Sequence, residues 1–322
     1  MPTLNAYSQL TLLELAKRTD PKGNMAIIAE VLQRDNEILQ DAPWIEANDT
    51  FGHKIVQRMT LPSGSWRKLN AGVAAEASQT RELTETIGML ETYSEADKDL
   101  VIAAADPRAF RNSEALAFLE GLSQTLATTF IYGNAGADPE KFTGLAPRLD
   151  VLAQTNVLGA GGSGGDTTSM FVVPWGEDKV FFTYPKGSKS NGVNHTDLGE
   201  VTKVDSSGYM WQVYRDHFQV KCGLVVKDER CIARIANCET SGTTNIFDED
   251  LLITALNKMP MSGRGAIVYV NATLKTYIEI IAKDKSNVFY TAKDAFGVEQ
   301  TMVRGCPIHK VDAILDTETV VA

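Results

Sequence analysis

The glycine-rich segment at residues 159–165, GAGGSGG, is the part of the chain that comes nearest to a reactive motif. Its spacing fits the dinucleotide-binding pattern G-x-G-x-x-G and also G-x-S-x-G, in which Ser163 would be the nucleophile of a hydrolase. Both motifs need a helix directly after the glycines, because the helix N-terminus binds the pyrophosphate or presents the serine. Residues 167–173 have the composition of a strand, and no Gly-Lys-Ser/Thr follows for a P-loop. We therefore interpret the segment as a flexible loop.

The histidines, cysteines and carboxylates form no recognisable catalytic or metal-binding arrangement. No histidines have the HExxH spacing and no cysteines form a CxxC pair. Asp216 and His217 are neighbours in an alternating segment and would point to opposite faces of a strand. The run of carboxylates between residues 82 and 99 is typical of a solvated face. Reduced, buried thiols are expected at Cys222, Cys231, Cys238 and Cys306. The residues thus predict no enzyme activity, no cofactor and no metal site.

The composition is that of an ordinary globular protein. The chain has 322 residues, of which 43% are hydrophobic and 22% charged, which argues against a disordered or fibrous chain. The net charge of −10 disfavours a surface that grips nucleic acid or an anionic membrane. No run approaches the roughly 20 apolar residues of a membrane helix, and the first residues lack a basic signal-peptide region. We expect a soluble protein without a membrane partner.

The first half of the chain predicts two helices and an extended arm. Apolar spacing predicts a helix over residues 24–40. Residues 51–70 are β-prone on both sides of a Pro-Gly turn at 61–65, which predicts a two-stranded arm that needs a further surface to lie on. Asp106-Pro107 predicts the start of a helix of about 25 residues, roughly 37 Å long, that ends at Gly133-Asn134 with a left-handed residue.

The second half predicts short strands and two further helices, with a domain boundary near Leu158. The expected strands are 170–173, 179–184, 211–226, 231–236 and 266–270, and the expected helices are 248–259 and 272–283. The last 35 residues return to strands. The fold class is α+β, without a strict βαβ repeat.

Several segments, in this order along the chain, resemble the major capsid proteins of tailed bacteriophages, in the group typified by short-tailed temperate phages. They are LPSGSWRKLNAGV (61–73), TETIGMLETYSEADKDL (84–100), ATTFIYGNAGADPEKFTGLAPRL (127–149), WGEDKVFFTYPKGSKS (175–190), DLGE (197–200), YRDHFQVKCGLVVKDERCIARIAN (214–237) and RGCPIHKVDAILDTETVV (304–321). The resemblance implies the Hong Kong 97-like capsid fold. Its expected parts are an N-terminal helical arm (1–47), an extended E-loop hairpin (48–75), a peripheral domain with the spine helix (76–158), an axial domain (159–285) and C-terminal strands (286–322).

The resemblance implies a shell protein of the virion that is assembled in the host bacterial cytoplasm. Copies of the chain would form the hexamers and pentamers of an icosahedral head that encloses double-stranded DNA without sequence-specific binding. Implied partners are portal and scaffolding proteins, with a cement or decoration protein as a further option. The chain shows no long charged N-terminal extension, so a separate scaffolding protein is expected. Covalent crosslinking, which some relatives carry out through a lysine and an asparagine, is not expected.

Two loops are the implied contacts between subunits. The E-loop tip would contribute Leu61, Pro62, Ser63, Gly64, Trp66, Arg67 and Lys68, and the loop after the spine would contribute Asp138, Pro139 and Phe142. Three alternatives stay open: an encapsulin-like nanocompartment shell, a tail-tube or baseplate subunit, and a hydrolase that uses Ser163. The long uninterrupted helix argues against the tail-tube subunit, and the strand after the glycines argues against the hydrolase.

Overall fold

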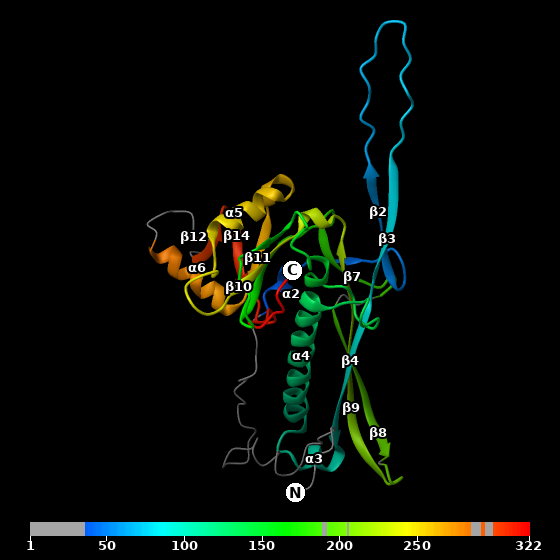
Figure 1. Cartoon of the computed structure of the whole chain (residues 1–322). Coiled ribbons are helices and arrows are strands. Elements are labelled where there is room, and N and C mark those ends of the chain that lie inside the picture. Colours follow the sequence, from blue (N-terminus) through cyan, green and yellow to red (C-terminus); the bar gives the residue numbers. More distant parts are fainter. Residues whose placement is uncertain (1–35, 189–191, 205, 285–290, 294–298) are drawn as a thin grey trace. The chain divides into compact units, whose positions relative to one another are not determined.

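The computed structural model describes residues 36–188, 192–204, 206–284, 291–293 and 299–322 (Figure 1). These residues form two compact units, each built from segments that are far apart in the sequence. As far as the ranges are described, the small unit consists of Met89–Leu126 and Gly192–Lys221, and the large unit of Asp35–Gly88, Ala127–Asn191 and Cys222–Ala322. The predicted helix at 24–40 therefore lies almost wholly outside the described residues, which include only the short helix α2 (Ile38–Asp41) at its end.

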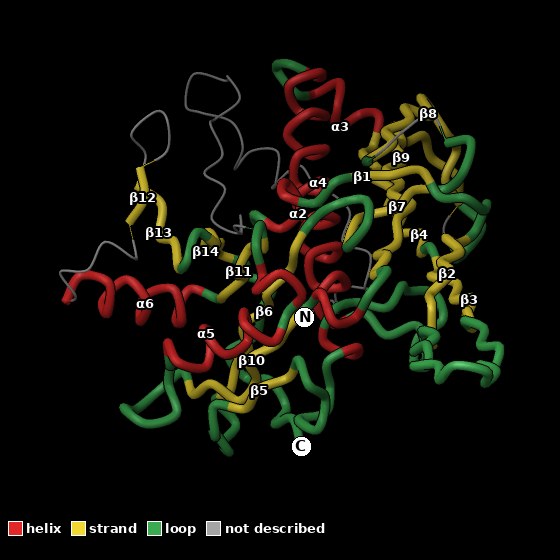
Figure 2. The backbone as a smooth tube through the Cα atoms, turned by 90° about the horizontal axis from the view of Figure 1, so that it is seen from above, coloured by secondary structure: helices red, strands yellow, loops and turns green. Residues whose placement is uncertain are grey.

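The large unit contains a mixed sheet of seven strands in the order β12-β13-β14-β11-β6-β10-β5 (Figure 2). Their bounds are β5 (Val157–Gly159), β6 (Thr167–Pro174), β10 (Ala233–Glu239), β11 (Ala266–Val270), β12 (Thr291–Lys293), β13 (Glu299–Val303) and β14 (Cys306–Lys310). β6 is antiparallel to both of its neighbours, whereas the β10–β5 and β11–β14 pairs are parallel. Mixed pairing of this kind, together with the helices, confirms the mixed α/β character expected from the sequence.

Both faces of this sheet are covered, which is why β6 is buried at every position. Met170 and Val172 point to one face and pack with helices α5 (Glu249–Lys258) and α6 (Ala272–Asp284). Ser169 and Phe171 alternate with them and point to the other face. There Ser169 meets Glu318 of the C-terminal segment, and Phe171 lies under the Arg234 guanidinium.

A second layer of the large unit consists of β1 (Trp44–Glu46), β7 (Val180–Tyr184) and the last residues of β9 (Met210–Val226). β1 is parallel to β7, and β7 is antiparallel to β9. Phe182 on β7 is fully buried, stacks on Trp44 at 4.8 Å between ring centroids and meets the edge of Phe130 at 4.6 Å. Three 3-10 turns complete the connections: η1 (Ala146–Arg148), η2 (Glu229–Cys231) and η3 (Pro260–Gly263).

The small unit combines strands β4 (Gly88–Asp97) and β8 (Val193–Val204), helix α3 (Lys98–Ala103), most of β9 and the first five turns of α4 (Pro107–Tyr132). β8 is antiparallel to β9, and β4 adjoins β9 in the same sheet. A small core gathers around the fully buried Phe110 of α4, with Leu100 and Val101 of α3.

Helix α4 begins and ends at the predicted residues. Asp106 caps it, because its Oδ1 accepts hydrogen bonds from the amides of Arg108 and Ala109 at 3.0 Å. The predicted left-handed terminator is wrong, since Gly133 has no positive φ. Gly133 is needed there for a different reason: a Cβ on it would lie 2.4 Å from the Thr129 carbonyl oxygen and 2.5 Å from that of Phe142.

The extended arm exists, but its second strand is not where the sequence placed it. β2 (Gly52–Thr60) pairs with β3 (Gln79–Thr86), and the last paired residues are Thr60 and Gln79. Residues 61–78 form the connection, which continues beyond the two strands as a long two-legged loop (Figure 1). The Pro-Gly turn at 61–65 therefore lies on one leg of this loop instead of reversing the hairpin.

The remaining expectations of secondary structure are confirmed within a few residues: 170–173 lies in β6, 179–184 in β7, 211–226 in β9, and 266–270 is β11. The predicted helices 248–259 and 272–283 correspond to α5 and α6. The sequence did not predict β1, β3, β4, α3, β5 or β8. Among the described residues, no helix has both the length and the apolar character needed to cross a membrane.

Candidate functional site

The glycine-rich loop does not have the geometry of a reactive site. Residues 161–163 are irregular, Ser163 is exposed, and the chain enters strand β6 at Thr167 without an intervening helix. Gly162 fits against its neighbour, because a Cβ there would lie 2.5 Å from the Asn237 carbonyl oxygen. The strand that follows removes the helix N-terminus that both the dinucleotide motif and the hydrolase motif require.

The histidine of the Asp216-His217 pair points away from its neighbour, as the strand alternation predicts. On one face of β9, the Asp216 carboxylate accepts two hydrogen bonds of 3.0 Å from Arg111 and lies 3.0 Å from His195 Nε2. On the other face, His217 stacks on Tyr93 at 4.5 Å. Asp216 is thus neutralised by a permanent cation, which is an arrangement of structural ion pairs. Among the described residues, no group of histidine, cysteine and carboxylate side chains could hold a metal ion.

The four cysteines are free and buried, as expected. Burial raises the pKa of the Cys222 thiol to about 12 and that of Cys238 to about 12. Thiols with such pKa values stay protonated at neutral pH and are poor nucleophiles.

The carboxylates between residues 82 and 99 do not form a solvated face, and that expectation is wrong for several of them. Glu85 is nearly buried in a bidentate pair with Arg148. In the small unit, Glu95 bonds Lys203 and Arg215, and these cations lower its pKa against the opposing effect of burial. The sequence missed these pairs because each partner lies more than 60 residues away along the chain.

The loop at residues 61–78 is exposed along its whole length. Trp66 and Leu69 are the extreme cases, with relative exposures of 105% and 92%. An exposed tryptophan beside a leucine and two cations, Arg67 and Lys68, is unusual for a surface that faces only water. The predicted residues of this loop are thus placed together on one projection.

Across the base of the same loop, one carboxylate joins the two legs. Glu76 accepts hydrogen bonds from the amide of Ser63 at 2.7 Å and from the amide of Gly64 at 3.2 Å. The Ser63 hydroxyl lies 3.5 Å from the other oxygen of Glu76. No local pattern in the sequence points to Glu76, because only the folded loop brings its carboxylate to the turn at Ser63 and Gly64.

The loop that follows helix α4 differs from the expectation at one residue. Pro139 is exposed and Asp138 is half-buried, with its carboxylate 2.9 Å from Lys141. The Phe142 side chain is only 3% exposed and packs within its own chain near Gly88. The Phe142 side chain therefore packs inside its own chain, and the accessible candidates are the half-buried Asp138 and the exposed Pro139.

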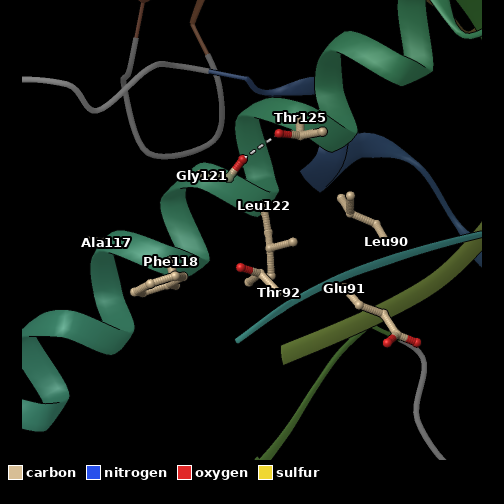
Figure 3. A pocket seen from close by; sticks show the side chains of 8 residues that line it. All are labelled: Leu90, Glu91, Thr92, Ala117, Phe118, Gly121, Leu122 and Thr125. Carbon is tan, nitrogen blue, oxygen red and sulfur yellow. Dashed lines mark hydrogen bonds between the residues drawn. The ribbon is translucent and has the colours of Figure 1, made fainter. Parts of the chain in front are cut away.

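The small unit has a groove between helix α4 and strand β4, with a cavity of about 460 Å³ (Figure 3). Leu90, Phe118 and Leu122 provide most of its apolar lining, and Thr125 donates its hydroxyl to the Gly121 carbonyl oxygen. Among the described residues that line it, the only ionisable side chain is that of Glu91, which is engaged with His217 and Gln219. This described lining suits apolar contact and contains no acid–base pair.

Residues 20–322 match the family model described as Major capsid protein GP7. Among curated proteins, no sequence matches the chain. Among solved structures, a chain of the cryo-EM structure of bacteriophage Epsilon15 is 32% identical, with 99% of both chains covered and a TM-score of 0.74.

Two further structures are more distant. A chain of the holo-SrpI encapsulin complex from Synechococcus elongatus PCC 7942 is 9% identical, with 72% of this chain and 98% of that chain covered and a TM-score of 0.49. A chain of the capsid of the native GTA particle is 12% identical, with 72% and 99% covered and a TM-score of 0.47. The first comparison and the family match identify the fold as Hong Kong 97-like and set aside the hydrolase, tail-tube and encapsulin alternatives. The chain therefore belongs to the Major capsid protein GP7 family, and it is a non-enzymatic major capsid protein of a tailed-phage head.

Proposed function

We propose that copies of this chain form the hexamers and pentamers of an icosahedral head, and that the loop at residues 61–78 is the E-loop that contacts an adjacent subunit. The observation that carries the proposal is the exposure of Trp66 and Leu69 on a loop whose residues are all exposed. Burial of a large apolar side chain contributes about 1.5–3 kcal/mol. Two such side chains per copy, repeated around a closed shell, supply a substantial driving force for assembly.

The chemistry of the loop also indicates the character of the surface that receives it. Arg67 and Lys68 directly follow the tryptophan, and the chain as a whole has a net charge of −10, so carboxylates are abundant on a neighbouring copy. A closed ring of identical subunits needs a heterologous contact, in which one surface meets a different surface of the next copy. A projecting loop that binds a complementary site elsewhere on the chain meets this requirement.

The division of the chain into functional parts follows the same proposal. The sequence placed the E-loop at 48–75 and the peripheral domain at 76–158; because the β2–β3 ribbon ends at Thr86, we assign the E-loop to 48–86 and the peripheral domain with spine helix α4 to 87–158. The N-terminal arm stays at 1–47, the axial domain at 159–285 and the returning strands at 286–322. The exposed Pro139 and the half-buried Asp138 after the spine form a second contact between subunits. The buried Phe142 side chain packs inside the chain near Gly88 and supports this loop.

The partners beyond the shell itself are also proposals. The acidic net charge supports enclosure of double-stranded DNA without tight or sequence-specific binding, since a shell that gripped phosphates would hinder packaging and release. Portal and scaffolding proteins, and a decoration protein on the outer surface, complete the expected set of partners.

Assembly of purified protein with and without the loop tests the proposal. In the first variant, an Asn-Gly turn replaces residues 61–78 and joins Thr60 to Gln79, which are already paired. The second variant is Trp66→Ala, with Trp66→Phe as the control that keeps an aromatic ring at this position. We expect shells or tubes by electron microscopy for the natural chain and Trp66→Phe, and none for the loop replacement. Assembly of the loop-replaced protein at the normal protein concentration would contradict the role of the loop.

A further inference from the structure

We propose that Glu76 holds the E-loop, before assembly, in the conformation that presents Trp66 to the neighbouring subunit. The hydrogen bonds from the Ser63 and Gly64 amides to the Glu76 carboxylate are called the clamp below. This inference rests on the proposed function of the loop. It makes Glu76 a positioning residue, because Glu76 acts on the exposed side chains at the tip through the backbone of Ser63 and Gly64.

The need for a clamp follows from the end of the β ladder. Paired strand residues stop at Thr60 and Gln79, where the amide of Gln79 donates to the Thr60 hydroxyl at 3.0 Å. Every residue from 61 to 78 is exposed, so packing against the remainder of the chain does not order the loop. Two legs of this length without paired strand residues would sample many conformations. Binding to a neighbouring subunit would then cost the conformational entropy of ordering them.

Glu76 supplies the missing connection. Its carboxylate accepts the amide hydrogens of two consecutive residues, Ser63 at 2.7 Å and Gly64 at 3.2 Å, from the opposite leg. Hydrogen bonds to an ionised acceptor are stronger than those between neutral groups. Gly64 has φ of +68°, a left-handed conformation that glycine adopts without strain, and its amide donates to the same carboxylate oxygen as the amide of Ser63.

Beyond the clamp, the tip is closed by a second turn. The amide of Ala71 donates to the Lys68 carbonyl oxygen at 3.3 Å, and Asn70 is left-handed with φ of +62°. Trp66 therefore lies between the clamp and this turn, and Leu69 lies within the turn itself. The clamp shortens the free part of the loop, and this reduces the ordering cost that the contact between subunits must overcome.

The first test measures the clamp in unassembled protein, using Glu76→Ala, the conservative variant Glu76→Gln, and Glu82→Gln as the matched control. Glu82 is an exposed carboxylate on strand β3 of the same ribbon, and its nearest cation, Lys54, is 3.8 Å away. Loss of a charge-assisted hydrogen bond predicts that Glu76→Ala speeds trypsin cleavage after Arg67 and Lys68 by about tenfold. Glu76→Gln retains an acceptor oxygen and should give an intermediate rate, while Glu82→Gln should match the natural chain. Equal cleavage rates for all four proteins would overturn the proposal.

The second test measures the protein concentration at which shells form. We expect Glu76→Ala to raise this concentration by about tenfold, as the larger ordering cost predicts, and Glu76→Gln to restore most of the difference. Faster cleavage of Glu76→Ala with unchanged assembly would overturn the link between the clamp and assembly. Trp66→Ala is assayed in parallel, because normal assembly of that variant contradicts the proposed contact itself and not the clamp.

Discussion

Arg148 donates two parallel hydrogen bonds to the Glu85 carboxylate, from Nη1 to Oε1 and from Nη2 to Oε2, both of 2.7 Å. The two side chains are only 8% and 12% exposed. Arg148 also donates to the carbonyl oxygens of Gly144 and Thr143 at 3.2 Å. One guanidinium thus connects the loop after helix α4 to strand β3, which is the second strand of the β2–β3 ribbon.

Removal of Arg148 should strongly destabilise the chain. Arg148→Ala leaves the Glu85 carboxylate nearly buried without its cation, and loss of one partner of a buried ion pair costs about 3–5 kcal/mol. The free energy of unfolding in urea, measured on unassembled protein, checks this value. The matched control is Lys141→Ala, because the side chains of the Lys141–Asp138 pair in the same loop are 51% and 43% exposed, and this pair should contribute far less to the free energy of unfolding. Equal losses for the two variants would show that burial of the Arg148 pair is unimportant.

Two glycines of the same region should respond in opposite directions to replacement by alanine. At Gly133, a Cβ would lie 2.4 Å from the Thr129 carbonyl oxygen, so Gly133→Ala should cost about 1–3 kcal/mol through forced backbone movement. At Gly121, in the middle of helix α4, a Cβ would meet nothing within 4 Å. Gly121→Ala should therefore stabilise the helix by about 0.5–1 kcal/mol. Thermal unfolding of both variants checks the pair, and a stabilising Gly133→Ala would contradict the packing argument.

The sequence predicted the elements whose signals are local. Helix α4 was placed to the residue because the Asp106-Pro107 cap and the apolar spacing lie within the helix itself. Strand β11 was placed equally well, because its apolar run AIVYV is buried at nearly every position. Short-range chemistry of this kind does not depend on what the rest of the chain does.

The missed elements depend on distant partners. β3 has the polar sequence QTRELTET and is mostly exposed, so its strand conformation comes from pairing with β2 and not from burial. β8 is similar, since most of its residues are exposed and its order comes from pairing with β9. The Glu76 clamp and the Glu85 pair are invisible in the sequence for the same reason: their partners are brought close only by the fold. The resemblance to phage capsid proteins supplied the function, which the residues alone did not.

His309 should make the stability of the large unit depend on pH. Its pKa is raised above the ordinary 6.5, mainly by a 2.6 Å hydrogen bond from Nδ1 to the Asp41 carboxylate. Burial and Lys275 oppose the rise, and Glu37 supports it, while Tyr269 donates its hydroxyl to Asp41 from β11. Because the folded-state pKa is raised, the stabilisation is fully present below about pH 6.5 and is lost as the pH rises through the folded-state value.

Urea unfolding at a series of pH values from 5.5 to about 9 measures this contribution. The natural chain should lose stability as the pH rises through this window, and His309→Gln should remove most of that slope. His53→Gln is the control. Burial lowers the pKa of His53, so its effect on stability is confined to pH values below about 6.5 and adds no slope above that pH. A His309→Gln variant with the same slope as the natural chain would refute the assignment to this group.

The C-terminal segment should be indispensable for folding because it carries the counter-ion of a buried arginine. Glu318 is 6% exposed and Arg234 is 4% exposed, and the Arg234 Nη2 lies 2.8 Å from the Glu318 carboxylate. The same carboxylate accepts hydrogen bonds from the hydroxyls of Ser169 and Tyr132. Glu318→Ala therefore removes the acceptor of these two hydroxyls and of the Arg234 guanidinium at once. We expect a loss of about 3–5 kcal/mol in the free energy of unfolding. The control is Thr319→Ala at the exposed neighbouring position, which should change the free energy of unfolding by less than about 0.5 kcal/mol. Comparable losses for the two variants would mean that the backbone of the segment, and not the Glu318 carboxylate, holds it in place.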